Sequence, residues 1–178
     1  MAQINTVPDK LINFKVYSEG NDVIGVADAE LPAIEYMTEG LSGAGILGEI
    51  EAPAFGQMKS LAVKLKFRTI TKDGVGLLAA KTHKLDLRGS IQAYDAADAE
   101  FKPYAAKLVV HGLTKKSSLG KFEVGKPGDS EVELECTYLK LSVGDQDEAL
   151  EIDKLNFVFK VNGEDQMADV RGHLGIGE

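Results

Sequence analysis

Three glycines form the pattern in this sequence that most resembles a cofactor site. Gly43, Gly45 and Gly48 have the G-x-G-x-x-G spacing with which a dinucleotide-binding fold approaches a pyrophosphate. That chemistry requires the pattern to follow a strand and to open a helix. Here Pro53 follows closely, and the next regular pattern, from Leu61, is that of a strand. The context therefore argues against a nucleotide site, and we predict no cofactor.

Three carboxylates recur at every second position in Glu131, Glu133 and Glu135. Paired carboxylates can act as general acid and base, so a hydrolase that uses Glu133 or Glu135 is one hypothesis. Three in a row along one strand are more typical of a solvated face, where they oppose sideways aggregation or line a channel. We therefore interpret them as candidate lumen or surface carboxylates.

The remaining reactive residues form no recognisable catalytic or metal-binding set. His83, His111 and His173 lie far apart in the sequence, and none has a second ligand at a metal-binding spacing. Cys136 is the single cysteine, which excludes an internal disulfide and favours a small buried side chain. The sequence predicts no catalytic residue and no metal, and hence a protein that is not an enzyme.

Charge and hydropathy narrow the range of partners. The formal net charge of −8, with a pI near 5.0 and no extended basic cluster, argues against a protein that reads nucleic acid. No apolar run approaches the roughly 20 residues of a membrane span. We expect no membrane partner.

Apolar residues alternate with polar ones over most of the chain, which is typical of half-buried strands. The clearest runs are Leu61 to Phe67, Leu85 to Ala93 and Glu131 to Tyr138. The phase of the alternation shifts after Tyr138 and again after Ile152, as a bulge or a change of packing partner would require.

These patterns predict one mainly β domain over residues 1–178, an antiparallel sandwich or barrel of seven or so strands. One or two short helices are expected, at about Lys72–Ala80 and near Asp165–Arg171. The glycines that follow predict a flexible tail over residues 172–178.

Glu39 to Gly56 is the exception to this regularity, a long glycine-rich segment that also contains aliphatic residues. Long loops of this kind are uncommon and usually functional or disordered. The aliphatic residues favour burial against another molecule, and a partner subunit is the natural candidate.

From Cys136 onward the sequence resembles the major tail tube proteins of contractile-tailed bacteriophages and related phage tail-like particles. The residues that carry the resemblance are Cys136–Tyr138, Leu141, Glu151–Asp153, Asn156, Lys160–Gly163 and Asp165. Gly43 to Gly45, the overall length and the order of elements agree with it.

The resemblance implies a structural protein of the virion tail, assembled in the host cytoplasm. Its subunits would join into homohexameric rings that stack into a hollow inner tube, with a sheath protein outside and a tape-measure protein inside. Tail terminator and baseplate proteins would bind the tube ends, and DNA would pass through the lumen only in transit. A lumen rich in carboxylates would suit that passage, because an attractive wall would trap DNA.

Within the long segment, we predict that an assembly loop contacts the adjacent ring. Its residues are Gly40, Leu41, Gly43, Gly45, Ile46, Leu47 and Gly48. Three alternatives stay open at this point: the tube of a headless bactericidal particle, the tube of a secretion system, and a monomeric β-barrel that binds a ligand in its interior.

Overall fold

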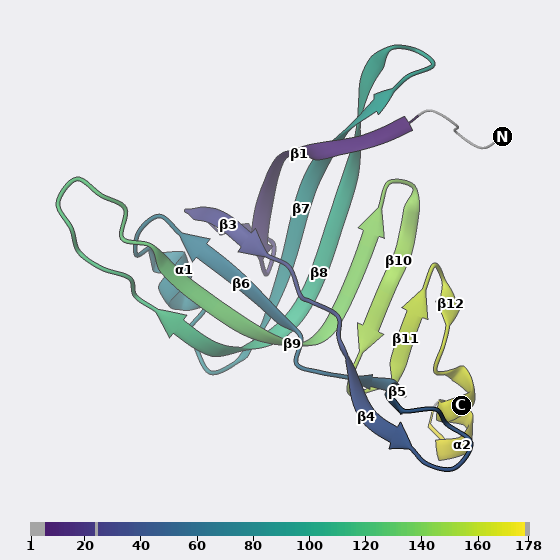
Figure 1. The fold of residues 1–178 in the computed structure, drawn as a ribbon. Coiled ribbons are helices and arrows are strands. Elements are labelled where there is room, and N and C mark those ends of the chain that lie inside the picture. The colour runs from purple at the N-terminus through teal and green to yellow at the C-terminus, as the bar shows by residue number, and fades with distance from the viewer. Residues whose placement is uncertain (1–5, 24, 177–178) are drawn as a thin grey trace.

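Antiparallel strands dominate the computed structural model, which describes residues 6–23 and 25–176 (Figure 1). The two helices of the described residues are α1 (Lys72–Gly76) and α2 (Ala168–Leu174). The strands are β1 (Thr6–Ser18), β2 (Asn21–Asp22), β3 (Val26–Glu30), β4 (Tyr36–Ser42), β5 (Glu49–Met58), β6 (Ala62–Phe67), β7 (Thr82–Asp95), β8 (Glu100–Ser118), β9 (Ser130–Val143), β10 (Gln146–Asp153), β11 (Val158–Val161) and β12 (Glu164–Asp165). The predicted mainly β fold with short helices is confirmed, although seven strands was too few.

Ten of the described strands form one antiparallel sheet, in which β9 is shared between two parts. The main path runs β12-β11-β10-β9-β8-β7-β1-β2. The first half of β9 pairs with β6, and β6 pairs in turn with β3; the second half pairs with β10. Because β2, β3 and β12 each pair on one side only within the described residues, the sheet does not close into a barrel. Of the two predicted architectures, the sandwich is the one observed.

A bulge in β9 marks the transition between its two halves. Against β8, Cys136 pairs with Gly112 and Tyr138 pairs with His111, which leaves Thr137 as the extra residue. The buried positions accordingly change from Cys136 to Leu139, and the predicted phase shift is confirmed as a bulge. The second predicted shift, after Ile152, is instead a turn that joins β10 to β11.

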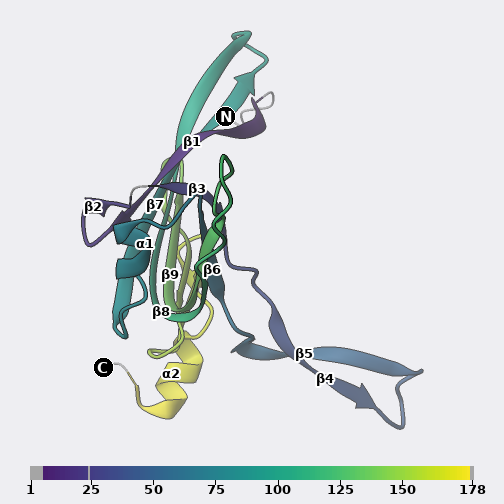
Figure 2. The ribbon, with the colours of Figure 1, turned by 90° about the vertical axis from the view of Figure 1, so that its left-hand side faces the viewer.

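The core lies between the two parts of the sheet. Val63, Leu65 and Phe67 of β6 are almost fully buried in one cluster with Leu85 and Leu87 of β7. Figure 2 shows β6 on one side of this core and β7 on the other. Burial of each such side chain contributes about 1.5–3 kcal/mol, so this apolar contact is the main force that holds the layers together.

Helix α1 is shorter than predicted and ends at Gly76. The Thr71 hydroxyl accepts the Gly74 N–H at 3.0 Å, which caps the first turn. His83, one of the candidate ligands, is buried, and its Nε2 donates to the carbonyl of Ala79 at 3.0 Å. It is thus a satisfied core histidine.

Helix α2 is fastened to the sheet by one ion pair. Asp165 accepts from the Met167 N–H at 2.9 Å and from Arg171 Nη2 at 2.6 Å, and Arg171 also donates to the carbonyl of Phe157. The helix continues through residues 172–174, which the sequence assigned to a flexible tail, and ends at Gly175 in the left-handed conformation (φ +66°). Residues 177–178 of that predicted tail lie outside the described residues.

Substitution of Gly112 tests the packing at the bulge. A Cβ at Gly112 would lie 2.8 Å from the backbone oxygen of Glu135, so β8 and β9 would have to separate. Gly112→Ala should reduce the free energy of unfolding by about 1–3 kcal/mol in urea titrations. Gly172→Ala is the control, because a Cβ there would meet no atom within 4 Å beyond its own helix, and alanine favours a helix. Equal stability of the two variants would contradict this packing.

The Asp165–Arg171 pair predicts a pH-dependent stability. The Arg171 guanidinium lowers the pKa of Asp165 from its usual 3.8. Because the folded pKa is depressed, the stabilisation is complete above pH 3.8 and is lost as the pH falls through the lowered value. Asp165→Asn should therefore cost about 1–3 kcal/mol at neutral pH and progressively less in acid. Glu164→Gln, at an exposed neighbour, should match the wild type at every pH.

Candidate assembly surfaces

The predicted loop from Glu39 to Gly56 is a β-hairpin that stands clear of the body (Figure 2). Strands β4 and β5 pair with each other alone, with Leu41 opposite Ile50 and Gly40 opposite Glu51. The prediction of an irregular loop was therefore wrong. Frequent glycines and Pro53 obscure the strand pattern, although Pro53 is tolerated because β5 is an edge strand.

The three glycines of the G-x-G-x-x-G pattern lie in the turn of this hairpin. Gly43, Gly45 and Gly48 have φ values of +151°, +92° and +102°, which side chains with a Cβ rarely adopt. The turn is closed by a 3.1 Å hydrogen bond from the Ile46 N–H to the Gly43 carbonyl. The pattern joins two strands and opens no helix, so the glycines are explained by the turn.

The two faces of the hairpin differ in character. Paired residues share a face, so Leu41 and Ile50 lie together with Glu39, while Glu49 and Glu51 lie on the opposite face. Leu41 and Ile50 are each about half exposed, at 51% and 52%. Among the other large apolar residues of the hairpin, Met37, Leu47 and Phe55 are exposed, and Ile46 is partly buried.

The root of the hairpin, in contrast to its tip, is fixed to the body. Lys59 donates its N–H to the carbonyl of Glu35 at 2.9 Å, and the Tyr36 ring meets that of Phe159 edge to face at 6.3 Å. The Met167 side chain lies against Gly56, where a Cβ would collide with its sulfur. These contacts set the direction in which the free end projects.

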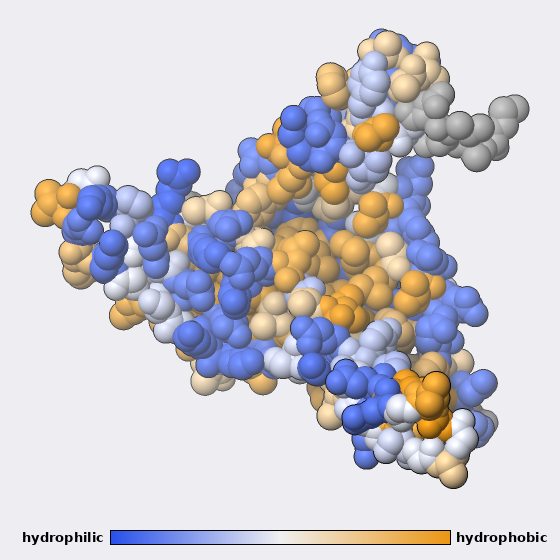
Figure 3. All heavy atoms as spheres, in the orientation of Figure 1, coloured by the Kyte–Doolittle hydropathy of each residue, from blue (hydrophilic) through white to orange (hydrophobic). Residues whose placement is uncertain are grey.

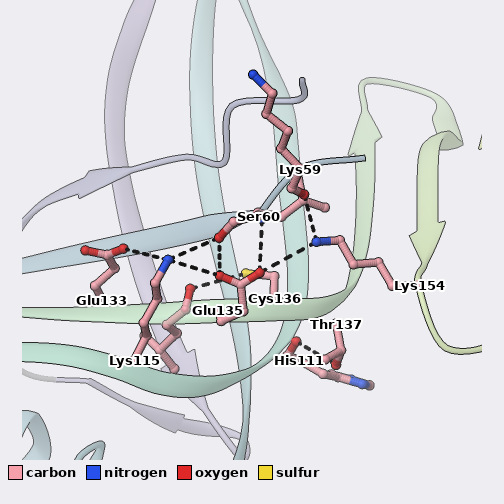
Figure 4. A network of polar contacts seen from close by, with 11 residues as sticks. Lys59, Ser60, His111, Lys115, Glu133, Glu135, Cys136, Thr137 and Lys154 are labelled. Carbon is pink, nitrogen blue, oxygen red and sulfur yellow. Dashed lines mark hydrogen bonds and ion pairs between the residues drawn. The ribbon is translucent and has the colours of Figure 1, made fainter. Parts of the chain in front are cut away.

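The three predicted carboxylates lie on the outer face of β9, within a ladder of opposite charges. Lys64 and Lys66 of β6 stand directly opposite Glu133 and Glu131. Lys115 Nζ reaches Glu133 at 3.7 Å and Glu135 at 3.5 Å (Figure 4). All three glutamates are partly buried, not freely solvated. The face is therefore mixed in charge.

Glu135 is the best connected of the three. It accepts from the Ser60 hydroxyl and from the Leu61 N–H, and Lys154 Nζ lies 3.6 Å away (Figure 4). Burial alone would raise the pKa of Glu135, but Ser60, Lys154 and Lys115 outweigh it and lower the pKa. A carboxylate held ionised between two ammonium groups is unsuited to act as a proton donor near neutral pH, which argues against the hydrolase hypothesis.

Cys136 lies behind this network and is fully buried. Burial raises the pKa of its thiol to about 11, so the thiolate is scarce at neutral pH. This agrees with the predicted role of a small core residue. Among the residues that the structure describes, no group of three or more His, Cys, Asp or Glu side chains is placed to hold a metal.

The loop over residues 119–129 joins β8 to β9, and its exposed apolar side chains were not predicted from the sequence. Phe122 and Val124 are almost fully exposed, at 94% and 103%. The base of the loop is held by hydrogen bonds from Lys121 to Gly128 and from Gly128 to Arg68. Apolar and charged residues do not alternate regularly along this loop, so the sequence pattern predicts no regular element there.

A second feature that the sequence did not reveal is an apolar groove of about 440 Å³ between β1, β3 and the sheet formed by β7, β8 and β9. Leu11, Leu31 and Ile91 are among its lining residues. Apolar side chains gather in the middle of the face that Figure 3 shows, with polar ones around them. No helix in the described parts of the chain is long and apolar enough to cross a membrane.

Comparison with known proteins gives consistent matches along nearly the whole chain. Residues 8–175 match the family described as phage tail tube protein FII. The chain is 27% identical over 175 residues to the tail tube protein of Escherichia phage P2, with 96% of this chain and 99% of that protein covered. It is 24% identical over 173 residues to the major tail tube protein of Serratia phage KSP20, with 96% and 98% covered.

Among solved structures, the fold is similar to that of a sheath/tube terminator of an extracellular contractile injection system in its extended state. The TM-score is 0.51 at 15% identity, with 76% of this chain and 96% of that one covered. The sequence relatives are structural proteins and not enzymes, which confirms the predicted absence of catalysis. The chain belongs to the phage tail tube protein FII family, and its role is that of a structural component of a tail tube.

Proposed function

We propose that this protein forms the inner tube of a contractile phage tail as homohexameric rings that stack on one another. The tube serves as the conduit through which DNA enters the host. The sheath protein surrounds it, the tape-measure protein occupies it during assembly in the host cytoplasm, and tail terminator and baseplate proteins bind its ends. The tail tube proteins of phages P2 and KSP20 favour a complete phage over a headless particle or a secretion system.

The observation that carries this proposal is the β4–β5 hairpin. It projects from a root that is fixed to the body, and it exposes Leu41 and Ile50 on one face. A two-stranded hairpin without packing is marginally stable in water, so it gains most of its order from a partner. Contact with the adjacent ring would supply that partner.

The charge ladder supports a more specific proposal about the lumen. Its outer face belongs to the part of the sheet formed by β3, β6, β8 and β9, and we assign that face to the tube interior. Because Lys64, Lys66 and Lys115 alternate with the glutamates, such a wall neither attracts nor strongly repels DNA. This differs from the purely acidic lumen that the sequence suggested.

Polar substitution of the hairpin tests the assembly. Leu41→Ser/Ile50→Ser removes two aliphatic contacts worth about 1.5–3 kcal/mol each when buried. The critical concentration for tube formation should therefore rise by at least about tenfold in light scattering, with short or absent tubes in negative stain. Ser42→Asn, on the opposite face of the same hairpin, is the control and should leave tubes unchanged.

Two results would contradict this account. Tubes of normal length from the double variant would show that the hairpin is not the contact. A wild-type protein that remains a 19.1 kDa monomer at every concentration would instead favour the monomeric ligand-binding alternative.

Accessibility of Glu131→Cys tests the lumen assignment. In assembled tubes a small maleimide should enter through the open ends and label this cysteine, whereas a maleimide attached to a large polymer should not. The unassembled variant, in which both reagents have access, is the control. Equal labelling of tubes by both reagents would place this face on the outside.

A further inference from the structure

Asn162 and Gly163 form the two-residue turn that joins β11 to β12, and they are the single Asn-Gly pair of the chain. Their φ values are +53° and +82°, and positive values at both central positions are what a type I′ hairpin turn requires. Both residues are exposed. The turn accounts for this pair, but it also brings together the two groups of a reaction that needs no enzyme.

An asparagine that precedes a glycine can lose its side-chain amide spontaneously. The backbone nitrogen of the glycine gives up its proton to hydroxide and attacks Cγ of the asparagine. A bond from this nitrogen to Cγ forms, the bond from Cγ to Nδ2 breaks, and ammonia leaves. Water then opens the succinimide ring at either carbonyl, which gives aspartate or isoaspartate. Glycine favours the attack because it has no Cβ to obstruct it.

The surroundings of the turn leave both reacting groups free. Asn162 is held through its other polar atoms: its N–H donates to the Ala149 carbonyl at 2.9 Å, and its Oδ1 accepts from Gln146 Nε2 at 3.1 Å. Among the described residues, neither Nδ2 of Asn162 nor the N–H of Gly163 has a hydrogen-bond partner. A Cβ at Gly163 would meet no atom within 4 Å, so water reaches the turn.

The attack also requires the turn to rotate so that the Gly163 nitrogen approaches Cγ, and the short ladder beside it permits this. Strands β11 and β12 share two pairs, Val161 with Glu164 and Lys160 with Asp165. Within the described residues, β12 pairs with no other strand. Such an edge opens at a lower free-energy cost than the core strands.

The other asparagines of the chain are each followed by a residue with a side chain. Asn156 precedes Phe157, and its Nδ2 donates to Asp153 Oδ2 at 2.7 Å. Asn13 precedes Phe14, whose N–H donates to Asn13 Oδ1 at 2.8 Å. A crowded nitrogen and an engaged amide both slow the attack, so these two asparagines serve as internal references.

We propose that Asn162 is a site of spontaneous deamidation and that its conversion to isoaspartate releases helix α2. Isoaspartate places an additional CH2 group in the backbone of a two-residue turn, and turn length sets the register of a hairpin. A shift of β12 displaces Asp165, which holds α2 through Arg171 at 2.6 Å. Because Met167, at the start of α2, lies against Gly56 of β5, the root of the β4–β5 hairpin loosens as well. The reaction takes place within one subunit, so it does not depend on the tube assignment.

Ageing of the purified full-length protein at mildly alkaline pH tests both steps. Peptide mass spectrometry should find Asn162 deamidated at least about tenfold faster than Asn13 and Asn156, because its attacking nitrogen is the unhindered one. Labelling by protein isoaspartyl methyltransferase should find isoaspartate in the same peptide. Hydrogen exchange at residues 168–174 should become faster in the aged protein than in the fresh protein.

Asn162→Gly is the matched control. Two glycines also adopt the type I′ turn, so this variant should fold in the same register, and it has no amide to lose at this position. After the same ageing, its hydrogen exchange at residues 168–174 should be unchanged.

Three results would overturn the proposal. Deamidation of Asn162 no faster than that of Asn13 and Asn156 would show that the folded turn protects it. Isoaspartate at Asn162 with unchanged exchange at residues 168–174 would show that β12 keeps its register and α2 its ion pair. An equal rise in exchange in aged Asn162→Gly would place the cause elsewhere in the chain.

Discussion

The shared strand β9 is the constraint on which the rest of the subunit depends. Its first half pairs with β6 and its second half with β10, while β8 runs along both. The bulge at Thr137 lets Cys136 and Leu139 both point into the core despite their odd spacing. One strand can thus belong to two layers, and the apolar contact between β6 and β7 closes the sandwich.

The same region determines how the β4–β5 hairpin is held. Lys154, at the end of β10, donates to the carbonyl of Lys59 at 2.9 Å and pairs with Glu135 of β9. The Lys59 N–H in turn donates to the Glu35 carbonyl, and Lys59 Nζ pairs with the Glu35 carboxylate. These two contacts join the chain just before β4 to the chain just after β5. The position of the hairpin is therefore tied to the charge ladder through a few contacts, although exposed ion pairs taken singly contribute little to stability.

The parts of the fold that could be predicted from sequence are those governed by local alternation. Val132, Leu134 and Cys136 indicate a half-buried strand because they alternate with Glu131, Glu133 and Glu135, and all three are buried in the structure. The hairpin was missed because its strands have no core to face, so neither face needs to be continuously apolar. The aliphatic residues among its glycines nevertheless suggested that this segment contacts another subunit. That contact stays a prediction.

Features that depend on long-range pairing could not be predicted. The bulge between Thr114 and Lys116 directs Lys115 toward Glu133 and Glu135, and no spacing in the sequence shows that these charges meet. The groove likewise combines β1, β3 and β7 to β9, which come together only in the folded sheet.

The central claim is that subunits associate through a hairpin that each one leaves uncovered. Electron cryomicroscopy of the assembled wild-type protein tests it most directly. The account predicts stacked six-fold rings in which residues 36–58 of each subunit are ordered against a neighbouring ring. Rings or tubes in which this hairpin projects freely into solvent would contradict it.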